Sequence, residues 1–234
     1  MKLRNFLLLL LIIIATAGIL LINISTSGIV LFEKLNSEVN HHILHQSFTL
    51  ILSFIVLFVL WLFRKDTFLH YFKIGNPKAA ITPEPLVGIN PKSNETWFHY
   101  GRNIAIIITL VTAIVMYFQG IKGNGVVFAD VLKILPFVFI FAITNSFVEE
   151  TITRLGVVVS LHGSVSDKTI PMISALIFGV IHYWGSPSGI TGVIVAGFLG
   201  WFLAKSILET RGIFWAWIIH FMQDIIIFSV ILID

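Results

Sequence analysis

Long uninterrupted runs of apolar residues dominate this sequence and restrict what it can fold into. Of its 234 residues, 57% are hydrophobic and only 12% are charged, whereas soluble domains carry about 25% charged residues. A helix needs roughly 20 apolar residues to cross a hydrocarbon core. Lipid offers no partner to backbone polar groups, so a helix is the favoured spanning element. The sequence therefore predicts an all-α, polytopic transmembrane helical bundle and excludes a soluble globular protein.

Seven apolar segments are long enough to be predicted as membrane spans. They are 6–24, 43–63, 104–119, 126–149 with a continuation towards 154, 170–184, 190–207 and 213–233. The longest polar stretch, 64–102, contains four prolines and is predicted to be a loop with a short interfacial helix at 68–74. We divide the chain into N-terminal spans with this loop, 1–103, and a core, 104–234, that holds the candidate site.

The distribution of Lys and Arg predicts the orientation of these spans. Cytoplasmic loops carry an excess of basic residues. With the N-terminus inside, all but Lys34, Lys122 and Lys133 fall on the cytoplasmic side. We therefore expect a multi-pass protein of the cell membrane, surrounded by the lipid bilayer, with a cytoplasmic N-terminus and no nucleic-acid partner. Residues 15–17 resemble a signal-peptidase site, but the apolar run continues to Ile24, which favours an uncleaved first span.

The end of the fourth predicted span carries two adjacent glutamates and an arginine. Ionisable residues within a bilayer are costly and need a partner or a function. Glu150 and Arg154 are four residues apart and are predicted to form a structural ion pair. Glu149 lies about 100° further around the helix. It has no basic residue four positions away, so it is predicted to be unpaired and suited to general-base chemistry.

Two later spans carry histidines. His182 lies about 18 Å from the cytoplasmic start of its span, with Phe178 one turn before it. His220 and Asp224 share one face of the last span. Each group alone is compatible with a hydrogen bond in the core. Together with Glu149 they are predicted to converge in the cytoplasmic half of the bundle, as a water-activating or metal-binding set.

These segments resemble the motifs of the CAAX prenyl protease and bacteriocin-processing (CPBP, or Abi) family of intramembrane endopeptidases. The family pattern is E-E-x-x-x-R, F-x-x-x-H and H-x-x-x-N. The chain has E-E-T-I-T-R from Glu149, F-G-V-I-H from Phe178 and H-F-M-Q-D from His220, in the same order. The resemblance covers 126–224. It implies CAAX-type hydrolysis of a peptide or prenylated-protein substrate near the cytoplasmic leaflet.

The resemblance also implies a role for each residue. Glu149 and His182 would activate the water that attacks the scissile carbonyl, and His220 with Asp224 would stabilise the oxyanion. The supporting residues would be Glu150, Arg154 and Phe178. Asp224 departs from the pattern, because the Asn expected there can donate a hydrogen bond, whereas Asp donates only when protonated. Otherwise Asp224 would accept from His220 and orient it.

Metal dependence is open at this point. Two His and two carboxylates could ligate zinc, through Glu149, His182, His220 and Asp224. The resemblance to glutamate-dependent members favours a metal-free reaction without a cofactor. A second group, His41, His42 and His45, resembles a small metal cluster, but we predict solvated histidines at the outer boundary.

Other functions compete with the protease. A bacteriocin-immunity or membrane scaffold protein would keep the fold without cleavage, and its activity would survive Glu149→Gln. A small transporter would normally show repeated halves, which the sequence lacks. Small residues at four-residue spacing, Gly192, Ala196 and Gly200, are predicted to serve close helix packing rather than chemistry.

Overall fold

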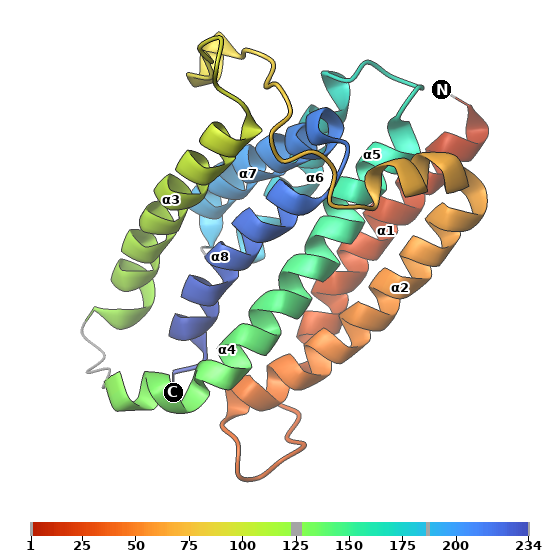
Figure 1. Ribbon diagram of the computed structural model, residues 1–234. Helices are drawn as coiled ribbons and strands as arrows, with labels where there is room; N and C mark the ends of the chain where they lie inside the picture. Colours follow the sequence, from red (N-terminus) through yellow and green to blue (C-terminus); the bar gives the residue numbers. More distant parts are fainter. Residues whose placement is uncertain (1, 123–127, 186–187, 234) are drawn as a thin grey trace.

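The computed structural model describes residues 2–122, 128–185 and 188–233, and it is a bundle of helices (Figure 1). In this part of the chain the only β-structure is two isolated bridges. Six helices are long and apolar enough to cross a membrane, and a seventh apolar helix, Thr169–Trp184, is shorter. The helices are α1 (Leu3–Thr26), α2 (Ser37–Tyr71), α3 (Trp97–Met116), α4 (Phe128–Glu149), α5 (Gly156–Leu161), α6 (Thr169–Ile181), α7 (Gly189–Thr210) and α8 (Phe214–Ile231). The predicted all-α bundle of about seven spans is confirmed.

The second helix is longer than the sequence predicts. α2 begins at Ser37, where the side chain of Asn36 caps its N-terminus, and it continues to Tyr71. The prediction of a separate interfacial helix at 68–74 is wrong, because these residues begin as the last part of α2. A kink at Arg64 (φ −140°, ψ 37°) lets the end of α2 turn across the top of the bundle (Figure 1), so one helix both spans and caps.

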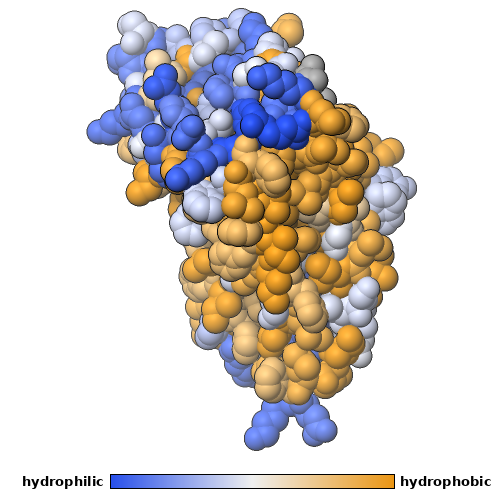
Figure 2. All heavy atoms as spheres, turned by 90° about the vertical axis from the view of Figure 1, so that its right-hand side faces the viewer, coloured by the Kyte–Doolittle hydropathy of each residue, from blue (hydrophilic) through white to orange (hydrophobic). Residues whose placement is uncertain are grey.

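The polar segment 72–96 folds over one end of the bundle and is anchored to α7. Glu209 Oε2 accepts hydrogen bonds from Trp97 Nε1 at 2.8 Å and from the backbone N–H of Thr82 at 3.1 Å. Lys205 Nζ lies 2.5 Å from the other oxygen of Glu209. Figure 2 shows hydrophilic residues gathered at this end, above a broad hydrophobic band. Such a band is the surface that a bilayer covers, as expected for a multi-pass membrane protein.

The α6–α7 hairpin is packed backbone against backbone. A Cβ added at Gly200 would lie 3.1 Å from the carbonyl oxygen of Ser174, and one at Gly179 would lie 3.0 Å from that of Val193. Small residues permit this approach, and the buried Ala196 lies on the same helix. Since Phe178 lies on α6 and His182 directly follows it, in the 3-10 turn η4 (His182–Trp184), the tight hairpin fixes where they point.

Candidate active site

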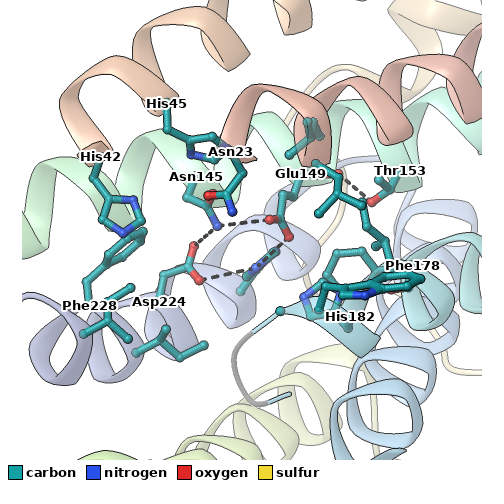
Figure 3. A pocket seen from close by; sticks show the side chains of 18 of the residues that line it. Asn23, His42, His45, Asn145, Glu149, Thr153, Phe178, His182, Asp224 and Phe228 are labelled. Atoms are coloured by element: carbon teal, nitrogen blue, oxygen red, sulfur yellow. Dashed lines mark hydrogen bonds and ion pairs between the residues drawn. The ribbon is translucent and has the colours of Figure 1, made fainter. Parts of the chain in front are cut away.

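A cavity of about 340 Å³ lies between α1, α2, α4, α6 and α8 (Figure 3). The structure brings all four predicted chemical residues to its wall: Glu149, His182, His220 and Asp224. Of the three predicted supporting residues, Phe178 also lines the cavity. Glu150 and Arg154 are almost completely buried, with 1% and 0% of their surface exposed. The adjacent glutamates therefore face different surroundings.

The two glutamates lie where α4 changes into a π-helical turn, η3 (Glu150–Leu155). Short π-helical segments within α-helices frequently occur at functional sites. Within this turn the carbonyl oxygen of Thr153 accepts a hydrogen bond from Ser174 Oγ on α6, at 2.9 Å. This contact ties the glutamate pair to the helix that carries His182.

Behind the cavity, Glu150 forms the centre of a buried ionic cluster. Its Oε1 lies 3.3 Å from Arg154 Nη1, so the predicted ion pair is present. The same oxygen lies 2.7 Å from His220 Nδ1, a contact between α8 and η3 that the sequence did not indicate. The guanidinium of Arg154 stacks on the ring of Phe178, 3.3 Å from its centre. Glu150 and Arg154 thus hold both His220 and Phe178 in place.

The prediction that Glu149 is unpaired is wrong. Its Oε2 lies 3.5 Å from His220 Nε2, and that nitrogen lies equally far from Asp224 Oδ1. The partner comes from α8, which i,i+4 spacing within α4 cannot show. Glu149 nevertheless faces the cavity, with 16% of its side chain exposed, compared with 4% for Asp224.

Asn145 is a site residue that the sequence reasoning missed. Its Nδ2 donates to Glu149 Oε1 at 3.3 Å and to Asp224 Oδ2 at 3.1 Å (Figure 3). Asn145 is in turn contacted by Gln46 Nε2 of α2, at 3.4 Å. The available signal was its position four residues before Glu149, which places both side chains on one helix face.

His182 presents one nitrogen to the cavity. Its Nδ1 lies 2.9 Å from the carbonyl oxygen of Phe178. A carbonyl only accepts, so Nδ1 carries the proton and Nε2 is left as an acceptor in the neutral ring. The partner is on its own helix rather than on a neighbouring one. The ring of Phe178 packs against the imidazole with centroids 4.0 Å apart.

A bound zinc ion would need several protein ligands that converge on one point. Among the described residues, no group of three or more His, Cys, Asp or Glu side chains is placed to hold one. His182 and His220 each use Nδ1 for a protein contact, so each offers only Nε2 to a ligand. That the reaction needs no metal stays a prediction.

The second histidine group, on α2, is less exposed than the sequence predicts. His41, His42 and His45 line the same cavity as Glu149, and His45 is only 6% exposed. The prediction that these histidines are solvated is therefore wrong for His45, whereas His41 and His42 are partly exposed. The turn of α2 that carries them packs inward, because His42 stacks edge-on against Phe228 of α8, with ring centroids 5.1 Å apart.

Residues 131–226 match the family model of type II CAAX prenyl endopeptidase Rce1-like proteins. This segment is therefore similar to Rce1-like domains. It lies within the predicted core, 104–234, and contains all the motif residues described above. No curated protein and no solved structure matches the chain. The similarity over this segment supports a relation to the CAAX-type intramembrane protease family.

Proposed function

We propose that this protein is an intramembrane endopeptidase that hydrolyses a peptide bond near the cytoplasmic leaflet, in CAAX-type protein processing. The observation that carries the proposal is the convergence of Glu149, His220 and Asp224, from two helices, on one cavity with 3.5 Å separations. A cavity-facing carboxylate can accept a proton from water, and imidazole can donate to a developing oxyanion. The Rce1-like match supports the same chemistry.

In the proposed reaction, a water molecule is held by Glu149 and by the free Nε2 of His182. Glu149 removes one proton, and the hydroxide adds to the scissile carbonyl carbon. The C–N bond then breaks, and the same proton passes from Glu149 to the leaving amine. Each hydrolysis consumes one water and returns the carboxylate to its starting form.

His220 and Asn145 are the proposed donors to the oxyanion and its surroundings. As an imidazolium, His220 donates from both nitrogens, so Nε2 can serve the oxyanion while Nδ1 stays with Glu150. Asp224 Oδ1 lies 3.5 Å from the same Nε2, so it can orient this N–H until the oxyanion forms and accepts from it. The nearby Asn145 supplies the amide that the family pattern places at position 224.

The low-dielectric surroundings strengthen these interactions. The buried pair Glu150–Arg154 and the ring of Phe178 keep His220 and His182 fixed before the substrate arrives. Electrostatic groups that are already oriented need no reorganisation in the transition state. The role of Glu150 is accordingly to position His220, whereas that of Glu149 is chemical.

The test is cleavage of quenched peptides, prenylated and unprenylated, by purified protein in detergent. Glu149→Gln is expected to lower kcat by about 10²–10⁴-fold in a protein that still folds. Glu33→Gln, at an exposed position outside the helices, is the matched control and should cleave normally. Parallel samples with a chelator report whether a metal is needed.

Two results would contradict the proposal. Normal cleavage by Glu149→Gln would show that Glu149 is not the base. Failure of the folded wild type to cleave any peptide would favour the non-catalytic immunity or scaffold function. Glu150→Gln distinguishes positioning from chemistry, since it is expected to lower folding stability as well as rate.

A further inference from the structure

Two arginines from different helices meet at the corner of the bundle where α1 begins and α2 bends (Figure 1). Arg4 is in the first turn of α1, and Arg64 lies at the kink of α2. Arg4 Nε lies 3.4 Å and Arg64 Nη1 lies 3.5 Å from the same atom, Asn5 Oδ1. Asn5 is 1% exposed and donates a hydrogen bond to Ser164 Oγ. The two guanidinium groups are therefore close enough to contact one anion.

In the part of the chain that the structure describes, no carboxylate forms an ion pair with Arg4 or Arg64. Arg64 Nη2 donates to the carbonyl oxygen of His162 at 2.6 Å, which supplies no charge, and Arg64 Nε is buried without a hydrogen bond. Asp167, which is 72% exposed, lies 3.7 Å from His162 Nδ1. Two neighbouring positive charges repel each other, so an anion between them would be stabilised.

Exposed apolar side chains begin directly beside this pair. Phe6 on α1 is 49% exposed and Phe63 on α2 is 54% exposed. Trp61, about one turn before Arg64, has Lys65 Nζ over its ring at 5.6 Å, and tryptophan is enriched where a membrane meets water. Figure 2 shows hydrophilic surface giving way to a hydrophobic band below this end of the bundle. The two arginines thus lie at the level where lipid headgroups meet acyl chains.

These features select a ligand with an anionic head and apolar chains. Guanidinium groups bind phosphate oxygens through two parallel hydrogen bonds. A soluble phosphate would use the arginines but not the apolar surface beside them, whereas a phospholipid would use both. Lys2 and Lys65 add two positive charges next to the pair in sequence, against one acid, Asp66. Such a basic cluster favours an anionic phospholipid over a zwitterionic one.

We propose that Arg4 and Arg64 bind the phosphate of an anionic phospholipid from the surrounding membrane. The bound headgroup would link the start of α1 to the point at which α2 turns across the end of the bundle. Neither arginine lines the cavity, and both lie outside the segment 131–226 that matches the family model. The proposal therefore goes beyond the proposed function and does not depend on it.

The test is a titration of the purified protein, in neutral detergent, with dioctanoyl phosphatidylglycerol, and native mass spectrometry measures the bound lipid. Arg4→Gln changes an exposed residue and is expected to weaken binding at least about fivefold, because one basic contact to an anionic lipid is lost. Adding Arg64→Lys, which keeps the charge but loses the planar fork, should weaken binding further. Arg102→Gln removes an exposed charge on α3 and is the matched control, which should bind like the wild type.

Four outcomes would overturn the proposal. They are wild-type affinity in Arg4→Gln, an equal loss in Arg102→Gln, equal binding of dioctanoyl phosphatidylcholine, and competition by glycerol phosphate as effective as that by the lipid. The last would indicate a site for a soluble anion. Size-exclusion profiles check that each variant is folded, and Arg4→Gln alone decides if the double variant is not. Since cleavage is not measured, failure of the proposed function would leave this result unchanged.

Discussion

The two ends of the cavity differ in how many ionic contacts join their side chains. The glutamate end holds four, between Glu149, Glu150, Arg154, His220 and Asp224. At the glutamate end, His220 contacts Glu150 at 2.7 Å and lies 3.5 Å from both Glu149 and Asp224. At the α2 end, His45 is almost as deeply buried and makes no hydrogen bond to another side chain. Buried atoms without a partner occur at both ends, since Glu149 Oε2 and Glu150 Oε2 also lack a hydrogen bond. Partnered groups are oriented before a substrate arrives, which favours chemistry.

The largest effect on stability should follow from a substitution of Arg154 in the buried ionic cluster. Arg154→Met leaves Glu150 buried without its cation, and removing one member of a buried pair costs about 3–5 kcal/mol. We expect the free energy of unfolding, measured by denaturant titration in detergent, to fall by about that amount. Arg102→Met, at an exposed position, should change it by less than about 0.5 kcal/mol. Equal, small effects of both would show that the buried cluster contributes no stability.

A smaller effect should follow from removing the amide between the two carboxyl groups. Asn145→Ala leaves Glu149 and Asp224 without their common donor. The loss of these hydrogen bonds, about 1–2 kcal/mol, should lower kcat about tenfold and leave KM nearly unchanged. Cleavage kinetics measure both constants. Thr144→Ala is the control, because Thr144 bonds only to carbonyls of its own helix. A change in KM alone would mean that Asn145 binds substrate instead.

Much of the fold and the motif residues could be predicted because both are local in sequence. Apolar runs indicate the helices, and i,i+4 spacing indicates Glu150–Arg154 and His220–Asp224. The contacts that decide the environment of Glu149 join α4 to α8 and could not be seen in one segment. Spacing therefore predicted which residues gather, whereas the partners of each atom came from the packing of the bundle.

The burial of His45 is a second feature that local sequence patterns did not predict. Its position near the predicted start of a span, beside acidic residues, is typical of a membrane boundary. Asn36 starts α2 six residues before the apolar run, so this turn packs against α1 and α8 instead of facing water. The early start of α2 at its N-cap, Asn36, thus places His45 inside the bundle. Hydropathy alone does not predict this.

The smallest effect on the free energy of unfolding should come from a substitution of His45. The sign of the change shows whether this buried imidazole is satisfied within the protein. His45→Leu replaces a buried imidazole that makes no hydrogen bond to another side chain by an apolar side chain of similar size. Removing an unsatisfied polar group is neutral or stabilising, so the free energy of unfolding should stay the same or rise by up to about 1 kcal/mol. His220→Leu, measured in the same way, should lower it, because Glu150 loses its contact. A fall of about 2 kcal/mol or more for His45→Leu would mean that His45 is already satisfied within the protein. The role of His45 would then be structural, like that of the residues in the buried ionic cluster.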